Sequence, residues 1–176
     1  MILLPLLAVL VRTLSGAGVD ALAAPADTRA IVYIFTTTDC PVSNRYAPEV
    51  RRIVDTFAVQ GVTFRLVYPG RADGDDAIRD HMRAFSYAGA LEAVRDPDLA
   101  FARFSGATIT PEAVVVAHGR VVYRGRIDDR VVDLGIDRPA PTVHDLSDAI
   151  EAVLAGRPVA HPVTQAVGCY IADLAR

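Results

Sequence analysis

One apolar run that leads into a cysteine and a proline constrains the fold of this chain more than any other feature. Residues 30–36 are almost continuously β-branched or aromatic, which is typical of a strand buried on both faces. Cys40 and Pro41 follow after a short polar turn, and proline is favoured in the first turn of a helix. We therefore expect Cys40 to be the N-cap of a helix that ends before Gly61. The apolar face of this helix would consist of Tyr46, Val50, Ile53, Val54 and Phe57.

The N-cap position would make Cys40 acidic. The first N–H groups of a helix have no partners inside the helix, and together with the helix dipole they favour a thiolate over a thiol. A free cysteine with a pKa of about 8.5 is only about 3% thiolate at pH 7, whereas a pKa two units lower gives roughly 75%. Because the thiolate is the reactive form, Cys40 is the predicted nucleophile.

The rest of the pattern predicts a single α/β domain, because 176 residues support one core of moderate size. The expected elements are strands at 62–68, 113–117 and 120–123, an aspartate-capped helix that buries Ile78, Met82 and Phe85, a short helix at 97–104 that buries Leu99, Phe101 and Phe104, and a closing helix at 143–154. Their order predicts a mixed sheet with helices on both faces. The tail at 159–176 shows no clear period.

The charged residues exclude several classes of function. The formal net charge is −3, and all 18 basic residues are arginines. A nucleic-acid-binding protein needs a clustered basic surface, which this composition does not favour. Without lysine, the chain cannot use a Schiff base, a P-loop lysine or a lysine general base.

Residues 1–24 have the layout of a signal peptide or of an N-terminal hydrophobic segment. The apolar run at 2–11 is too short for a stable transmembrane anchor, and small residues offer a cleavage point near Ala23 or Ala24. A buried first helix of the domain is the alternative. We expect residues 25–176 to form the domain itself, exported to the periplasm or another extracytoplasmic compartment, or tethered to a membrane by the segment.

Three features of the sequence resemble the thioredoxin superfamily. Residues 40–43 stand where thioredoxins carry Cys-x-x-Cys, Pro48 matches the proline inside their active-site helix, and Thr110-Pro111 matches their cis-proline loop. The resemblance implies an α/β fold of three layers, α/β/α, with a central mixed sheet. It also implies that the Thr110-Pro111 peptide is cis and lies beside Cys40. The substrate-binding residues that it implies are Pro41, Ser43, Thr110 and Pro111.

Within that superfamily the chain looks most like the peroxiredoxin-like redoxins, which are related to alkyl hydroperoxide reductases and thiol-specific antioxidants. Thr37 lies three residues before Cys40, as the threonine of those peroxidases does, but Tyr33 stands where they carry proline. The peroxide-polarising arginine of the family has three candidates, Arg45, Arg124 and Arg126. The similar segments are 106–112, 123–129 and 167–171, the last with a Gly-Cys-x-Ile element.

Cys169 lies in the irregular tail. A flexible segment with a lone cysteine suits a resolving thiol, and a static disulfide staple and an unpaired thiol are the alternatives. Ser43 occupies the place of a second motif cysteine, so a local Cys-x-x-Cys disulfide is impossible. Glu112 is a candidate proton relay to Cys40. The pair Asp128-Asp129 has the pattern of a solvated charged turn.

Together these features predict a thiol-based redox protein that uses no cofactor. Cys40 attacks an oxidised sulfur or a small peroxide, Cys169 resolves the product as an intramolecular disulfide, and the partner is an external thiol reductant or a disulfide-bearing protein. The histidines lack zinc-binding spacing, so we expect no metal ligands. The competing hypothesis is a non-catalytic thioredoxin-fold binding or assembly module that handles copper through Cys40, Cys169 and a histidine such as His161.

Overall fold

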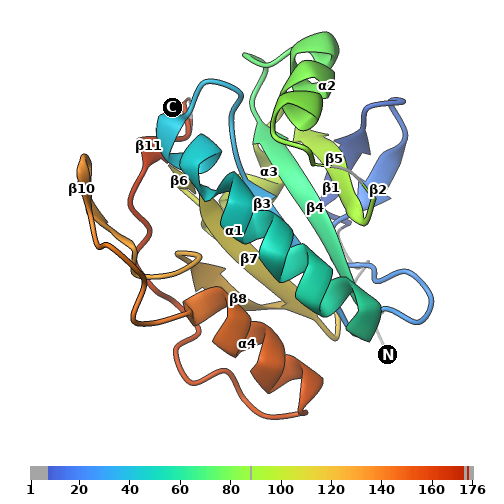
Figure 1. Cartoon of the computed structure of the whole chain (residues 1–176). Coiled ribbons are helices and arrows are strands. Elements are labelled where there is room, and N and C mark those ends of the chain that lie inside the picture. Colours follow the sequence, from blue (N-terminus) through green and yellow to red (C-terminus); the bar gives the residue numbers. More distant parts are fainter. Residues whose placement is uncertain (1–7, 88, 173, 175–176) are drawn as a thin grey trace.

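The computed structural model describes residues 8–87, 89–172 and 174, which form a seven-stranded sheet with helices on both faces (Figure 1). The sheet has the order β2-β1-β5-β4-β3-β7-β8. Its strands are β1 (Leu10–Thr13), β2 (Gly18–Asp20), β3 (Ala30–Phe35), β4 (Val62–Pro69), β5 (Leu91–Asp96), β7 (Glu112–Ala117) and β8 (Arg120–Gly125). The helices are α1 (Pro41–Phe57), η1 (Ala58–Gln60), α2 (Asp75–Ala84), α3 (Ala100–Ser105) and α4 (Asp145–Leu154). Two short ribbons pair β6 (Ile109–Thr110) with β11 (Cys169–Tyr170), and β9 (Val131–Asp133) with β10 (Ile136–Asp137).

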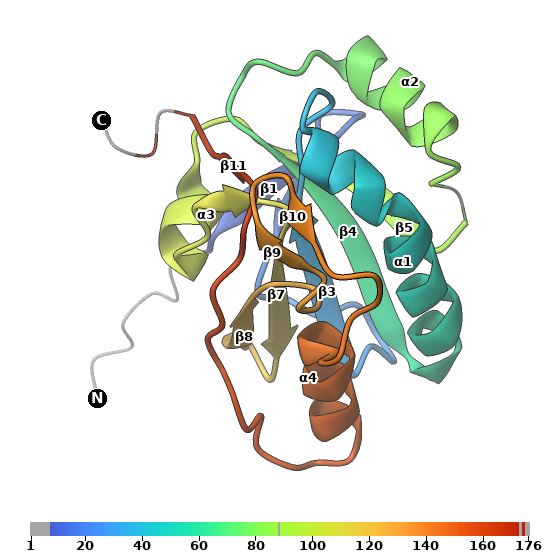
Figure 2. The same cartoon turned by 60° about the vertical axis from the view of Figure 1, so that its left-hand side comes forward.

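The elements form three layers. Helices α1, α2 and α4 cover one face of the sheet, and α3 covers the other (Figures 1 and 2). Strands β3, β4 and β5 are parallel, whereas β1, β7 and β8 run antiparallel to their neighbours. The expected three-layer α/β/α arrangement with a mixed central sheet is therefore confirmed.

Strand β3 lies at the centre of this arrangement and is buried on both faces, as its sequence predicted. All six of its residues are buried. Val32 and Ile34 pack in the core beneath α1 and α4, whereas Tyr33 and Phe35 point to the opposite face and contact the Phe101 ring of α3. The continuous apolar run is needed because both layers of helices rest on this strand.

The N-terminal segment contributes to the sheet. Within residues 1–24, the described part forms the hairpin β1–β2, and β1 pairs antiparallel with β5. Val11 and Ala21 are fully buried there. This differs from the alternative of a buried first helix, because Leu10–Thr13 is extended. Residues 1–7 lie outside the described residues, and cleavage near Ala23 or Ala24 stays a prediction.

Several local expectations were wrong. Phe104 is 52% exposed, because the buried face of the six-residue helix α3 contains Phe101 and Ala102 and does not include Phe104. Helix α2 has Gly74 rather than an aspartate as N-cap. Asp128 and Asp129 are buried, since hydrogen bonds from neighbouring residues replace water around them. Strand β5 was not expected at all.

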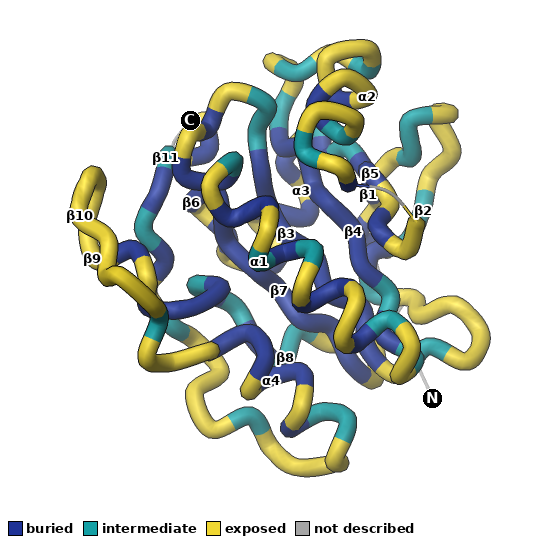
Figure 3. The backbone as a smooth tube through the Cα atoms, viewed as in Figure 1, coloured by how far each residue is buried: buried dark blue, intermediate teal, exposed yellow. Residues whose placement is uncertain are grey.

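Burial follows the three layers (Figure 3). The central strands β3, β4 and β7 and the inner sides of the helices are buried, whereas the outer side of α1 and most of the β9–β10 hairpin are exposed. Within the described residues, no helix is long and apolar enough to cross a bilayer.

Candidate functional site

Cys40 caps the N-terminus of α1, as the sequence predicted. Its side chain accepts a hydrogen bond from the Ser43 backbone N–H at 3.5 Å, and Pro41 occupies the first turn. Strand β3 ends at Phe35, so a four-residue turn delivers the cysteine from the sheet to the helix. The Cys40 side chain is only 1% exposed. A sulfur in this position faces the unpaired N–H groups of the helix.

The sheet register brings the proline loop to the same place. Phe35 at the end of β3 pairs with Glu112 at the start of β7. The loop after one strand and the loop before the other therefore leave the same edge of the sheet. The Thr110-Pro111 peptide is cis, and the Cys40 thiol donates to the Thr110 carbonyl at 3.2 Å. The expected neighbourhood of Cys40 and this loop is confirmed.

The tail brings Cys169 to Cys40. Strand β11 pairs antiparallel with β6, so that Cys169 lies opposite Thr110 and Tyr170 lies opposite Ile109. The two sulfur atoms are 2.7 Å apart, and both cysteines are present as free thiols. Only small movements separate this arrangement from a disulfide bond.

The pKa values of the two thiols are shifted in opposite directions. Burial raises the pKa of Cys40. The side chains of Cys169, Ser43 and Thr110 and the backbone N–H of Ser43 stabilise the thiolate and together lower the pKa more, so that it lies below the ordinary value. Burial, the hydrogen bond to Cys40 and the negative charge of its thiolate raise the pKa of Cys169 to about 12. As pH rises, the pair therefore loses its first proton from Cys40, while Cys169 keeps its own.

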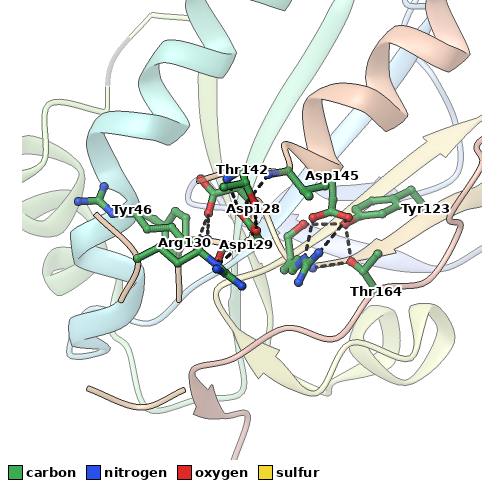
Figure 4. Close-up of polar contacts among 11 residues, drawn as sticks. Tyr46, Tyr123, Asp128, Asp129, Arg130, Thr142, Asp145 and Thr164 are labelled. Atoms are coloured by element: carbon green, nitrogen blue, oxygen red, sulfur yellow. Dashed lines mark hydrogen bonds and ion pairs between the residues drawn. The ribbon is translucent and has the colours of Figure 1, made fainter. Parts of the chain in front are cut away.

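The tail is docked on the domain, which corrects the expectation of a flexible segment with little packing. It runs along β8 towards β11 (Figure 2). Arg124 donates its N–H to the Pro162 carbonyl and accepts from the Thr164 N–H, at 2.9 and 3.0 Å. The Thr164 hydroxyl also bonds the Tyr123 hydroxyl at 2.7 Å (Figure 4). Ile171 is 6% exposed and packs on the α3 face of the sheet.

Glu112 supports the proline loop rather than facing Cys40. Its carboxylate accepts the backbone N–H groups of Thr108 and Ile109, at 2.8 and 3.1 Å, and pairs with Arg124 at 2.9 Å. Because these contacts occupy both carboxylate oxygens, Glu112 stabilises the conformation of the proline loop. The contacts do not support the expected role as a proton relay to Cys40.

The other predicted site residues divide into two groups. Pro41, Ser43, Thr110 and Pro111 surround Cys40, with Pro41 exposed and the other three buried. Thr37 contacts Cys40 through the backbone, where its carbonyl accepts the Cys40 N–H at 3.4 Å. No hydrogen bond joins the Thr37 hydroxyl to the sulfur in the described part of the chain.

All three candidate arginines are paired with carboxylates. Arg45 contacts Asp137 at 2.7 Å, Arg124 contacts Glu112 at 2.9 Å, and Arg126 contacts Asp145 at 2.6 Å. Each guanidinium therefore already has an anionic partner that is not the Cys40 sulfur.

A buried polar chain beside the Cys40 loop was not anticipated from the sequence. Asn44 donates to the Thr38 carbonyl at 3.2 Å, accepts from His81 Nε2 at 2.8 Å, and His81 Nδ1 bonds the Tyr68 hydroxyl at 2.8 Å. Burial lowers the pKa of His81 and so favours the neutral ring, whose Nε2 carries the proton when it donates to the Asn44 side-chain oxygen. The sequence offered only two separate signals for this chain of contacts. One was the asparagine four residues after Cys40, and the other was the histidine on the helix that was expected to bury Ile78.

Possible metal ligands gather away from the two cysteines. Glu49, Asp128 and His144 offer ligand atoms within 4.8 Å of one another. Glu49 is engaged by Arg52, and Asp128 by the Tyr46 hydroxyl at 2.6 Å (Figure 4). Among the described residues, no cluster of three or more such ligands includes Cys40 or Cys169, so His161 does not complete the copper set considered above.

Comparisons with known proteins agree with this architecture. The sequence matches no family model and no curated protein. An uncharacterized conserved protein from Geobacillus kaustophilus has 22% identity and a TM-score of 0.75, over 93% of this chain and 87% of that one. A secreted Mycobacterium tuberculosis disulfide oxidoreductase, described as homologous to E. coli DsbE, has 22% identity and a TM-score of 0.51, over 84% and 94%. A thioredoxin-like protein from Aeropyrum pernix has 12% identity and a TM-score of 0.60, over 85% and 89%. By its architecture, therefore, this chain has the thioredoxin-like fold.

Proposed function

We propose that this protein is a thiol–disulfide oxidoreductase in which Cys40 is the nucleophile and Cys169 is the resolving thiol. The observation that carries the proposal is the 2.7 Å separation of two free sulfurs with opposite pKa shifts. A thiolate at a helix N-terminus beside a protonated thiol is the arrangement that exchange chemistry needs.

The charges impose an order on the two steps. The Cys40 thiolate attacks one sulfur of a substrate disulfide, forms a mixed disulfide and releases the other sulfur as a thiolate. This removes the negative charge of Cys40, which is one cause of the raised pKa of Cys169. Cys169 is then easier to deprotonate, attacks the Cys40 sulfur and releases the second substrate thiolate. An external thiol reductant restores both thiols.

Peroxide reduction is the second candidate, since a thiolate also attacks peroxide oxygen to give a sulfenic acid. Disulfide exchange is favoured because Arg45, Arg124 and Arg126 are paired with carboxylates. A peroxidase also needs a donor at its sulfur to polarise the peroxide, and among the described residues none of these arginines hydrogen-bonds the Cys40 sulfur.

We also propose that the protein acts outside the cytoplasm. A pair of cysteines that forms a disulfide persists in oxidising compartments. The similar M. tuberculosis protein is described as secreted. Mass spectrometry of the protein recovered from culture fractions would identify its compartment and its mature N-terminus together.

The decisive experiment treats the wild type and two variants with 2,2′-dithiodipyridine and identifies the products by mass spectrometry. The wild type should release two pyridine-2-thione molecules and end as the Cys40–Cys169 disulfide. Cys169→Ser should stop at a stable adduct on Cys40, and Cys40→Ser should lose the rapid reaction. A structural disulfide predicts a different outcome. Both variants would then lose roughly 2–4 kcal/mol in the free energy of unfolding, and no adduct would be trapped on Cys40. Hydrogen peroxide in place of the disulfide tests the second candidate by sulfenic acid formation.

A further inference from the structure

We propose that the edge of β6 beside Cys40 is a binding site for an extended peptide in which a glycine precedes a cysteine, and that the C-terminal tail is its resident ligand. This rests on the function proposed above and adds the class of substrate. The partner would be a protein that presents a disulfide within a Gly-Cys strand.

The tail approaches Cys40 through main-chain contacts. Cys169 and Tyr170 pair with Thr110 and Ile109, and the Ile171 N–H donates to the Thr108 carbonyl at 2.9 Å. Such contacts use groups that every peptide carries, which is how an exposed strand edge accepts an additional strand. The edge of β6 therefore recognises an extended backbone and directs one of its side chains to Cys40.

Gly168 supplies the sequence requirement. A Cβ atom at this position would lie 2.1 Å from the carbonyl oxygen of Thr110 and 2.8 Å from its carbonyl carbon. Both are backbone atoms of a buried residue that is paired with β11, so they cannot move aside as a flexible side chain would. Only glycine fits directly before the cysteine when that cysteine reaches Cys40.

The positions after the cysteine make different demands. The Tyr170 side chain is 85% exposed, so the site does not select a side chain there. Ile171 is 6% exposed and enters the apolar cluster on the α3 face. The site thus selects an extended Gly-Cys-x-aliphatic segment, with the strictest requirement at the glycine.

The resident tail competes with any external peptide. Because it is part of the same chain, its effective concentration at β6 is high, and with the tail docked Cys40 is 1% exposed. An external Gly-Cys disulfide must replace β11 before the Cys40 thiolate attacks its cysteine sulfur. That attack forms the Cys40–peptide disulfide and releases the other sulfur as a thiolate, so no further oxidant is needed.

The test uses full-length protein in which Cys40 is the only thiol. Cys169→Ser is compared with the double variant Gly168→Ala/Cys169→Ser, whose own tail no longer fits β6. The probe is a synthetic peptide of residues 163–172 whose cysteine carries a 2-thiopyridyl disulfide, and a second peptide has alanine in place of its glycine. Release of pyridine-2-thione gives the rate, and mass spectrometry identifies the adduct on Cys40.

We expect the glycine peptide to react with the double variant roughly tenfold faster than the alanine peptide does, and roughly tenfold faster than it reacts with Cys169→Ser alone. Equal rates for the two peptides would overturn the proposal. Free 2,2′-dithiodipyridine separates the two levels of inference. If it modifies Cys40 while the peptides react equally, only the Gly-Cys site is wrong. If it does not modify Cys40 at all, the proposed function fails as well.

A second variant keeps the test decisive if Gly168→Ala does not fold. Ile171→Asn in the Cys169→Ser background places a polar group in the apolar cluster and should also release the tail. It should show the same preference for the glycine peptide. Gln165→Ala is the matched control in the tail, because Gln165 is exposed and, among the described residues, its side chain bonds only the neighbouring Ala166 carbonyl. It should react as Cys169→Ser does.

Discussion

Cys40 and Cys169 share one site but carry their protons differently. The N–H of Ser43 and the thiol of Cys169 stabilise a thiolate on Cys40, whereas the same thiolate opposes a second negative charge on Cys169. The Ser43 hydroxyl is buried and has no hydrogen-bond partner among the described residues, yet its proximity contributes to the lowered pKa of Cys40. It is therefore available to donate once the thiolate forms.

The acidity of Cys40 gives the first prediction. Alkylation by iodoacetamide, followed by mass spectrometry as pH rises, should show a midpoint for Cys40 below that of a free cysteine and a higher midpoint for Cys169. Ser43→Ala should raise the Cys40 midpoint, because it removes a donor to the thiolate. Ser147→Ala, a buried serine of α4, is the control and should change nothing. A wild-type Cys40 midpoint at or above about 8.5 would contradict the proposed nucleophile.

At the scale of elements, the C-terminal tail is held against the domain by backbone hydrogen bonds at two strands. It is anchored at Thr164 beside β8 and at β11 beside β6, and Gly125 makes the first anchor possible. Gly125 has a φ of +154°, and a Cβ there would lie 2.1 Å from the Thr164 hydroxyl and 2.5 Å from its carbonyl oxygen. The docked tail thus depends on two glycines. Gly125 in β8 leaves room for Thr164 of the tail, and Gly168 in the tail leaves room for Thr110 of β6.

Gly125→Ala should weaken the docking of the tail. The added methyl group cannot coexist with Thr164, so we expect a loss of roughly 1–3 kcal/mol in the free energy of unfolding. Chemical denaturation monitored by circular dichroism measures this. Gly18→Ala is the control, since nothing lies within 4 Å of its Cβ position, and it should change stability by less than about 0.5 kcal/mol. Equal stability of the two variants would show that the tail is not held at Thr164.

The N-terminal hairpin gives a prediction at the same scale. Val11 in β1 is fully buried, whereas the adjacent Leu10 is 54% exposed. Val11→Ala should therefore lower the free energy of unfolding by roughly 1–3 kcal/mol, and Leu10→Ala should cost less than about 0.5 kcal/mol. If both variants were as stable as the wild type, β1 would be dispensable, as expected of a segment that is removed before the domain functions.

At the scale of the whole molecule, buried tyrosines connect the layers. Tyr33 contacts α3, Tyr68 bonds His81 of α2, and Tyr123 bonds Thr164 of the tail. Burial is the largest cause of a raised pKa at each of these, and also at Tyr46 and Tyr87. The fold therefore stabilises the neutral phenols.

Alkaline pH should unfold the protein cooperatively. A group with a raised pKa in the folded state contributes its full stability below its unfolded pKa, which is about 10 for tyrosine, and loses it as pH rises further. The pKa of Tyr87 is raised to about 12, so the loss extends at least to that pH. Tyrosinate absorbance at 295 nm and circular dichroism should change together above about pH 10. Independent titration of the buried tyrosines near pH 10 with unchanged circular dichroism would contradict this.

The sequence by itself determined the position of Cys40 at the N-terminus of α1. The apolar run of β3, the Cys-Pro junction and the helical spacing of α1 are patterns within one stretch of chain, and local patterns specify local structure. The resemblance to thioredoxins added the cis Thr110-Pro111 loop. Together they were sufficient for the fold class and for placing Cys40 beside that loop.

Only the tertiary structure decided what surrounds Cys40. Whether Cys169 meets Cys40, which acid each arginine pairs with, and why Gly168 must be a glycine all depend on contacts between distant parts of the chain. Strands β1 and β5 and the tail escaped the sequence patterns for the same reason. Their short or irregular runs carry little period, and they acquire strand geometry or a fixed place only through the hydrogen bonds of a neighbouring element.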